Sequence, residues 1–457
     1  MQKKYSTRFW IVFTTISLVF LAGWFVFWEV KNQGLESLKR LLGLAPLTQE
    51  TRTDLETVIT LADSLLHTNG EEKTFLILFQ NNLELRPGGG FIGSFGILKV
   101  RDGNITHFSV HDTGNFDGRI PSTTPPPYPM RETLNIDSWK LRDSNYSPDF
   151  MENVKWAETF YQMGQGEERF DGVVAVTANV LTSFLKVTGP VDIPGFPGTY
   201  GEDNAILDLE YQVEQGYRKQ DIAPGERKSM MGILGLEILH RVKALPLSKK
   251  YELFQTVLAD LHKKDIQLLF KDTVLQEQVM AAHWDGAMDS AWKDDYLFLV
   301  DANLNSFKTD YFIKRSYAYT MDLTKEAPQA TLKVTYRNTA EKRDWLAKDY
   351  QTFLRAYVPA GSFLHTVTGA AKDPVYGELL GKKYFGALIQ VPIRMEKTVT
   401  FEYTLPKNLE REWYDLKIQK QPGLNDVPVI VTIISKDGSR EEKNFVLNRD
   451  TVLSELE

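Results

Sequence analysis

A glycine-rich segment beside an arginine is the part of this sequence best suited to binding a ligand. It reads Gln-Asn-Asn-Leu-Glu-Leu-Arg-Pro-Gly-Gly-Gly over residues 80–90. Glycine lets a ligand approach the backbone closely, and a guanidinium can hold phosphate oxygens through two parallel hydrogen bonds. We therefore predict that Arg86, Gly88 and Gly89 bind phosphate. The alternative is a glycine-rich connection between two strands, in which Arg86 makes a structural hydrogen bond.

A second polar segment, residues 111–119, follows a predicted strand, so its side chains emerge at one end of a sheet. Asp112 and Asp117 supply carboxylate oxygens, which suit Mg²⁺, and Arg119 could meet a phosphate beside that ion. The alternative is a turn in which Asp and Asn side chains cap backbone groups.

A third segment places Arg218 and Arg227 near predicted helix ends, where they could complete an anion site. The alternative is a solvated basic helix face. Other chemistries find no support, because the chain has no cysteine and no Gly-x-Ser-x-Gly motif. The net charge of −7 gives no general basic character, so we expect no nucleic-acid partner.

The N-terminal region contains an uncharged apolar run from Phe9 to Trp28. A helix of roughly 20 apolar residues crosses a bilayer, whereas the apolar part of a cleaved signal peptide is usually only ~7–15 residues long. Lys3, Lys4 and Arg8 precede the run and should stay in the cytoplasm. We predict a cytoplasmic tail at 1–8, an uncleaved single-pass anchor at 9–29 in the cell membrane, and the bulk of the chain outside the cytoplasm.

The remaining chain divides into three predicted regions by its periodicity. Residues 30–70 form a helical juxtamembrane segment, in which apolar residues recur at helical spacing from Leu55 to Leu66. Residues 71–295 mix short strands with helices, which indicates an α/β domain with a mixed sheet. Residues 296–457 alternate apolar and polar side chains, as at Leu332, Val334 and Tyr336, which predicts an all-β, antiparallel sandwich.

The α/β region resembles a bacterial membrane-anchored family known only as a domain of unknown function. The resemblance covers residues 71–312. It rests on the Asn-x-x-Glu-Leu-Arg-x-Gly-Gly block at 81–89, the Asp112 segment, the Phe-Asp-Gly-Val-x-Ala-Val segment at 170–176 leading to Thr-Gly-Pro-Val at 188–191, and Trp-Asp-Gly at 284–286.

Residues 171–191 are also similar to the LytR-CpsA-Psr phosphotransferases, which share an N-terminal anchor and use arginines with Mg²⁺. That resemblance implies transfer of a glycopolymer from a polyprenyl-pyrophosphate carrier to a cell-wall acceptor. Arg86 and Asp112 would then be catalytic, and Arg218 and Arg227 would correspond to later arginines. Three positions depart from the pattern: Pro87 and Gly88 replace Ser and Asp, and His111 replaces an arginine.

The leading hypothesis is therefore a membrane-anchored envelope protein whose α/β domain binds a lipid-linked pyrophosphate glycan precursor. If it is an enzyme, the reaction is phosphoryl transfer, with arginines and Mg²⁺ stabilising charge on the phosphates. The competing hypothesis is a non-catalytic envelope scaffold or adhesion protein that acts through its β-sandwich.

Overall fold

The computed structural model describes residues 47–220, 222, 229–407 and 414–454. The predicted anchor at 9–29 and its flanking residues lie outside this part of the chain, so the membrane topology stays a prediction. None of the helices that the structure describes combines the length and the apolar character that a membrane span requires. The described residues form two compact units, of which the smaller comprises 47–73, 99–106 and 270–282.

The smaller unit is built from two helices and the tip of a hairpin. Helix α3 (Gln49–Leu66) begins at Thr48, whose side chain accepts a hydrogen bond from Thr51 N. Thr57 Oγ1 donates to the Gln278 carbonyl oxygen at 3.2 Å and so joins α3 to α11 (Thr273–Ala281). The hairpin tip is an Asp-Gly turn at 102–103, where both residues have positive φ.

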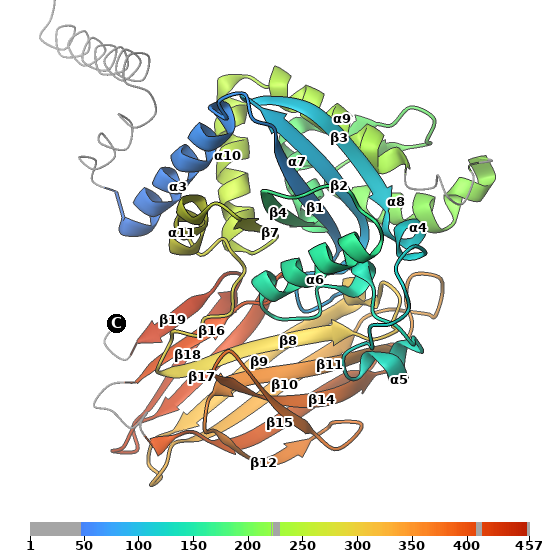
Figure 1. Ribbon diagram of the computed structural model, residues 1–457. Coiled ribbons are helices and arrows are strands. Elements are labelled where there is room, and N and C mark those ends of the chain that lie inside the picture. The colour runs from blue at the N-terminus through green and yellow to red at the C-terminus, as the bar shows by residue number, and fades with distance from the viewer. Residues whose placement is uncertain (1–46, 221, 223–228, 408–413, 455–457) are drawn as a thin grey trace, which may run out of the picture. The chain divides into compact units, whose positions relative to one another are not determined.

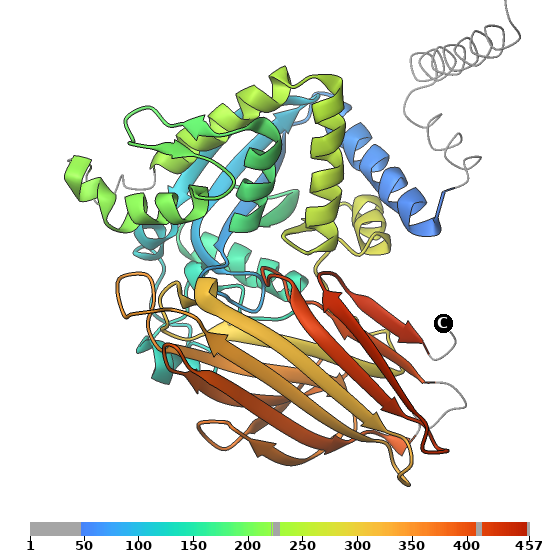
Figure 2. The same cartoon turned by 180° about the vertical axis from the view of Figure 1, so that it is seen from behind.

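The larger unit contains most of a five-stranded mixed sheet of order β3-β2-β1-β4-β7. Strands β1 and β4 are parallel, with Phe75 opposite Gly172. Figures 1 and 2 show helix α6 on one face of this sheet and α7 to α10 on the other. The strands are β1 (Lys73–Asn81), β2 (Phe91–Arg101), β3 (Asn104–Asp112), β4 (Gly172–Thr177) and β7 (Ile266–Phe270).

One face of the sheet packs into an apolar core, and the other face is covered by helices (Figure 1). On one face, Leu76 and Leu78 of β1 are buried with Val154 and Phe160 of α6, as strand alternation requires. On the other face lie a small β5-β6 hairpin and helices α7 to α10. The helices are α4 (Thr113–Asp117), α5 (Met130–Leu134), α6 (Phe150–Met163), α7 (Ala178–Thr188), α8 (Ala205–Glu214), α9 (Ser229–Ala244) and α10 (Leu247–His262), with 3₁₀ turns η1 (Leu141–Asp143) and η2 (Gly216–Gln220) and the strands β5 (Val191–Asp192) and β6 (Thr199–Tyr200).

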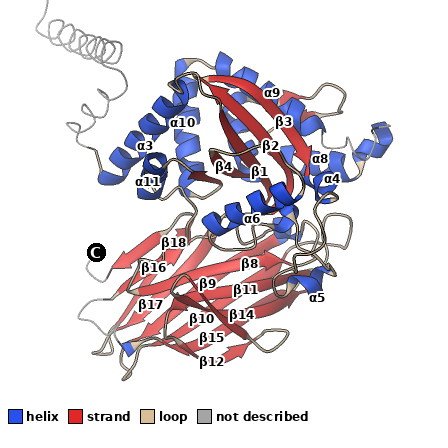
Figure 3. Cartoon of the chain, in the orientation of Figure 1, coloured by secondary structure: helices blue, strands red, loops and turns tan. Residues whose placement is uncertain are grey.

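The C-terminal part is β-rich, and its two six-stranded sheets share one apolar core. Figure 3 shows these strands in red. One sheet has the order β12-β15-β10-β9-β17-β18, and the other β13-β14-β11-β8-β16-β19. Their bounds are β8 (Asp295–Asn303), β9 (Ile313–Asp322), β10 (Gln329–Asn338), β11 (Tyr350–Pro359), β12 (Phe363–Thr368), β13 (Val375–Leu379), β14 (Lys382–Val391), β15 (Glu396–Thr404), β16 (Asp415–Gln419), β17 (Val427–Ile434), β18 (Arg440–Leu447) and β19 (Thr451–Ser454), with a 3₁₀ turn η3 (Thr309–Phe312).

The predicted combination of a mixed α/β region with a C-terminal β-rich region is confirmed at this level. The prediction of purely antiparallel C-terminal sheets is wrong, because β16 pairs parallel with β8 and β17 parallel with β9. Alternating side chains show which face of a strand is buried and say nothing about the direction of its neighbour. Strand β8 escaped prediction because all of its residues are buried, so it has no alternation.

Candidate functional site

The glycine-rich segment lies between β1 and β2 and is packed against protein. Gly88 N donates to the Asn145 carbonyl oxygen at 3.0 Å, and Gln267 Nε2 donates to the Gly88 carbonyl oxygen at 2.9 Å. A Cβ on Gly89 would lie 2.0 Å from Gln80 Oε1. The backbone is therefore closely approached here by side chains of the protein itself, as the alternative of a structural connection predicts.

Arg86 is buried and surrounded by acceptors of the protein, and its role as a phosphate ligand stays a prediction. Its Nε donates to Asp143 Oδ1 at 3.0 Å, one Nη to Glu84 Oε1 at 3.0 Å, and the other Nη to the Asn303 carbonyl oxygen at 2.8 Å. Burial alone would lower the pKa of Arg86, but the charges of Asp143 and Glu84 outweigh it and raise that pKa. The guanidinium is thus already committed to two carboxylates and a carbonyl.

The second predicted segment forms the short helix α4. Asp112 is its N-cap and accepts a hydrogen bond from Asn115 N at 2.8 Å. Asp117 is buried and accepts from Arg142 Nε at 2.5 Å, and burial raises the pKa of its carboxyl, an effect that Arg142 partly offsets. Arg119 is exposed and lies over the Phe116 ring.

Magnesium at Asp112 and Asp117 stays a prediction, and the arrangement gives it little support. A ready site needs several oxygen ligands facing one point, whereas here one carboxylate caps a helix and the other meets a guanidinium. Within the described ranges, no group of three or more His, Asp or Glu side chains could hold a metal ion.

Of the two later arginines, the structure describes only Arg218, and Arg218 does not line the pocket described next. Arg218 lies in η2, is exposed, and donates to Tyr217 Oη at 3.1 Å. Arg227 lies outside the described residues. None of Arg86, Arg119 and Arg218 is among the residues that line the pocket.

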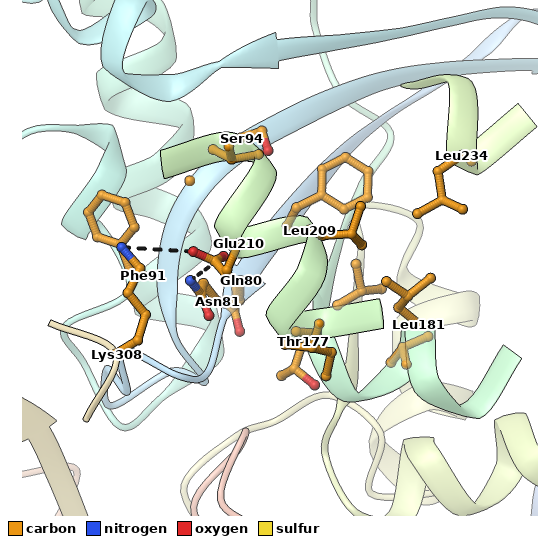
Figure 4. A pocket seen from close by; sticks show the side chains of 18 of the residues that line it. Gln80, Asn81, Phe91, Ser94, Thr177, Leu181, Leu209, Glu210, Leu234 and Lys308 are labelled. Carbon is orange, nitrogen blue, oxygen red and sulfur yellow. Dashed lines mark hydrogen bonds and ion pairs between the residues drawn. The ribbon is translucent and has the colours of Figure 1, made fainter. Parts of the chain in front are cut away.

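The pocket lies between the sheet and the helices α7, α8 and α9, and has a volume of about 320 Å³. Ligand sites are typically concave and mainly apolar, with volumes of roughly 300–1,000 Å³. Its walls are mostly apolar and include Phe79, Val180, Leu181, Phe184, Leu209 and Leu234. Figure 4 shows Leu181, Leu209 and Leu234 on one side of this space.

The other side of the pocket is polar and carries a small charge network. Asn81 Nδ2 donates to Glu210 Oε1 at 2.7 Å, and Lys308 Nζ lies 3.8 Å from Glu210 Oε2 (Figure 4). Lys308 Nζ also lies 3.2 Å from Glu214 Oε1. Burial alone would lower the pKa of Lys308, but the charges of Glu210, Glu84 and Glu214 outweigh it and raise that pKa. Lys308 is therefore held as a cation at the edge of an apolar space.

Sequence reasoning missed this pocket, although it predicted a mixture of strands and helices in this region. Val180, Leu181 and Phe184 are half-buried, so their helical spacing marks an apolar face without showing that the face is incompletely covered. The sequence contains one signal of a site here: Glu210 and Glu214 lie beside the apolar face of the same helix. These acids, four residues apart, place charge along one edge of α8.

The comparisons with known proteins bear mainly on the segment that forms most of the pocket. Residues 70–213 match the profile of a family described as protein of unknown function (DUF4012), which supports the predicted resemblance to a family of unknown function. No curated protein is significantly similar to this chain.

Two solved structures show weak likenesses, and at these TM-scores neither carries an argument. Protein gbs0355 from Streptococcus agalactiae aligns with a TM-score of 0.33 and 11% identity, over 49% of this chain and 76% of that one. Lin1025 from Listeria innocua aligns with a TM-score of 0.28 and 11% identity, over 47% of this chain and 78% of that one. For residues 70–213, the family of unknown function is the assignment that the comparisons support.

Proposed function

We propose that this protein is a membrane-anchored, extracytoplasmic envelope protein that binds the hydrocarbon part of a lipid-linked precursor. The observation that carries the proposal is the pocket of about 320 Å³, whose apolar walls end in a polar edge. Each buried CH₂ group contributes about 0.8 kcal/mol. About ten buried carbons would therefore supply roughly 8 kcal/mol before the entropic costs of association.

The polar edge suits the linkage group of such a lipid. An amphipathic ligand with its chain among Leu181, Leu209 and Leu234 would place its head near Lys308 and Asn81. A phosphate there would accept a charge-assisted hydrogen bond from the Lys308 ammonium, in competition with Glu210 and Glu214. The lipid-linked pyrophosphate glycan of the sequence hypothesis is one ligand of this chemistry.

Binding, rather than transfer, is the activity that we propose for the pocket. Phosphoryl transfer depends on several cations that stabilise charge on the phosphates. Among the described residues that line the pocket, Lys308 is the only cation, and two carboxylates already face it. Transfer of a glycopolymer with Mg²⁺, and the LytR-CpsA-Psr-like active site, remain hypotheses that need cations from elsewhere.

The test is to purify the full chain from membranes and identify the lipids extracted from it by mass spectrometry. Gly235 of α9 lines the pocket, and among the residues that the structure describes a Cβ there would have only Phe108 Cε1 within 4 Å, at 3.8 Å. Gly235→Leu should therefore reduce the pocket without a backbone clash and lower the recovered lipid about tenfold. Ile233→Leu, at an exposed position of the same helix, is the matched control.

Two outcomes would contradict the proposal. If Gly235→Leu folds normally and retains as much lipid as the natural chain, the pocket does not hold the hydrocarbon. If neither chain carries lipid, the scaffold function of the β-rich region takes its place. The location is tested separately: alkaline phosphatase fused after Glu457 should be active, because that reporter works outside the cytoplasm.

A further inference from the structure

The α9–α10 turn, by which we mean residues 240–252 from the end of α9 to the first turns of α10, exposes large apolar side chains. Helix α9 ends at Ala244 and α10 begins at Leu247. Leu247 is 84% exposed and Tyr251 is 61% exposed, and their spacing of four residues places them on the same face of α10. The buried apolar residues of α10, Leu253 and Leu261, follow later, so Leu247 and Tyr251 are not part of the core.

The same turn concentrates positive charge. Residues 240–252 contain Arg241, Lys243, Lys249 and Lys250 against Glu252, which gives a net charge of +3 in a chain whose net charge is −7. Lys249 pairs with Glu252 and Arg241 with Glu237. Lys243 and Lys250 are exposed, and within the part of the chain that the structure describes they have no ion-pair partner.

We propose that the α9–α10 turn docks onto the anionic surface of a lipid bilayer. Exposed apolar residues flanked by lysines on one helix are the pattern of segments that lie in the membrane interface. Apolar side chains enter the boundary of the acyl chains, while the lysines attract anionic headgroups over about one Debye length. An acidic protein surface would complement the charge, but it would leave Leu247 and Tyr251 without an apolar environment.

Docking would bring the pocket to the source of its ligand. Helix α9 contributes Leu234 and Ile238 to the pocket wall, and the same helix runs on to the exposed turn. This inference rests on the proposed membrane location. It does not depend on which lipid, if any, the pocket holds.

The test uses the full chain in lipid nanodiscs and takes advantage of the absence of cysteine. Ser248→Cys, in the turn, is labelled with an environment-sensitive fluorophore, and lipids carry a quencher at headgroup depth. With anionic lipids, we expect a blue-shifted and quenched emission, and a weaker effect with zwitterionic lipids alone. Ser439→Cys, in the exposed β17–β18 turn, is the labelling control and should stay unquenched.

A second set of variants should weaken the contact with the bilayer and leave the fold unchanged. Lys243→Ala with Lys250→Ala should weaken the contact about 25-fold, at about fivefold for each lysine near an anionic surface. Leu247→Ser should also reduce quenching, and its high exposure means that the melting temperature should not change.

Each remaining outcome has a definite meaning. Equal quenching at Ser248→Cys and Ser439→Cys, or quenching unaffected by the lysine substitutions, would overturn the proposal. So would protection of position 248 by an acidic protein in the absence of lipid. A chain that fails to enter nanodiscs through its N-terminus refutes the proposed anchor, and docking is then tested by adding the same labelled chain to anionic vesicles.

Discussion

Arg86 and Asp143 form a buried ion pair, in which Arg86 Nε donates to Asp143 Oδ1 at 3.0 Å. Loss of one partner from such a pair leaves an uncompensated charge and typically costs about 3–5 kcal/mol. Arg86→Ala should therefore lower the free energy of unfolding by about that amount, as measured by denaturant titration. Arg86→Lys should cost less, because it keeps the charge but loses part of the planar hydrogen-bond geometry.

Arg218→Ala is the control for this series, because Arg218 is exposed and should change stability by less than about 0.5 kcal/mol. If Arg86→Ala instead left the unfolding curve unchanged and abolished binding of a phosphate-bearing lipid, the result would support the predicted role of Arg86 as a phosphate ligand.

Gly423 packs against the glycine-rich segment, and this contact gives a second prediction. Gly423 has φ +71°, and a Cβ there would lie 1.9 Å from the Gly89 carbonyl oxygen. Gly423→Ala should cost roughly 1–3 kcal/mol for the left-handed conformation, plus the cost of moving the Gly89 backbone. Gly438 has φ +86°, and no atom of the described part of the chain would lie within 4 Å of such a Cβ. The difference in melting temperature between Gly423→Ala and Gly438→Ala therefore measures the contact, and equal losses would show that it is unimportant.

These contacts show which parts of the fold the sequence predicts and which it does not. Alternation at Leu332, Val334 and Tyr336 predicts the buried face of β10, because that pattern is local. The role of Arg86 is not local, since Asp143 lies 57 residues away and Asn303 lies 217 residues away. An arginine beside glycines is compatible with a phosphate site and also with a buried ion pair. Only the partners that are distant in sequence distinguish these two roles.

The pocket is hidden from sequence for a related reason. Its walls come from several elements, and each contributes an apolar face that would look the same if the core were filled. Periodicity shows that Leu181 and Leu209 face inward, but the volume left between them depends on how α7, α8 and α9 are spaced. The same limit applies to Lys308, which reaches the pocket from a segment about 100 residues beyond α8.

Asp260 gives a prediction about pH. Burial, with a smaller contribution from the charge of Asp265, raises the pKa of Asp260 to about 7, although Ser183 Oγ donates to its Oδ1 at 3.0 Å. The folded chain therefore binds this proton more tightly than the unfolded chain, and stability should fall as pH rises from about 4 to about 7. Asp260→Asn removes the ionisation and should raise the melting temperature at pH 8 while changing it little at pH 4.

The size of this effect is at most roughly 4 kcal/mol, because one pKa unit corresponds to about 1.4 kcal/mol. Ser183→Ala is a useful companion, since it removes the hydrogen bond to Asp260 and should steepen the loss of stability with pH. A melting temperature of Asp260→Asn that follows that of the natural chain from pH 4 to pH 8 would contradict the assigned shift.

Lys308 tests whether the polar edge of the pocket selects the head of the ligand. Lys308→Met removes the ammonium and keeps an apolar side chain of similar length beside Glu210 and Glu214. Loss of one charge-assisted hydrogen bond of about 1.5–3 kcal/mol should lower recovery of phosphate-bearing lipids by roughly 10- to 100-fold. Neutral lipids should be retained, because the walls at Leu181, Leu209 and Leu234 are unchanged.

Lys308→Arg keeps the charge and should keep the natural ratio of phosphate-bearing to neutral lipid. Equal loss of both lipid classes in Lys308→Met would mean that Lys308 supports the pocket wall and does not bind the headgroup. Unchanged recovery of both classes would mean that Lys308 plays no part in lipid binding.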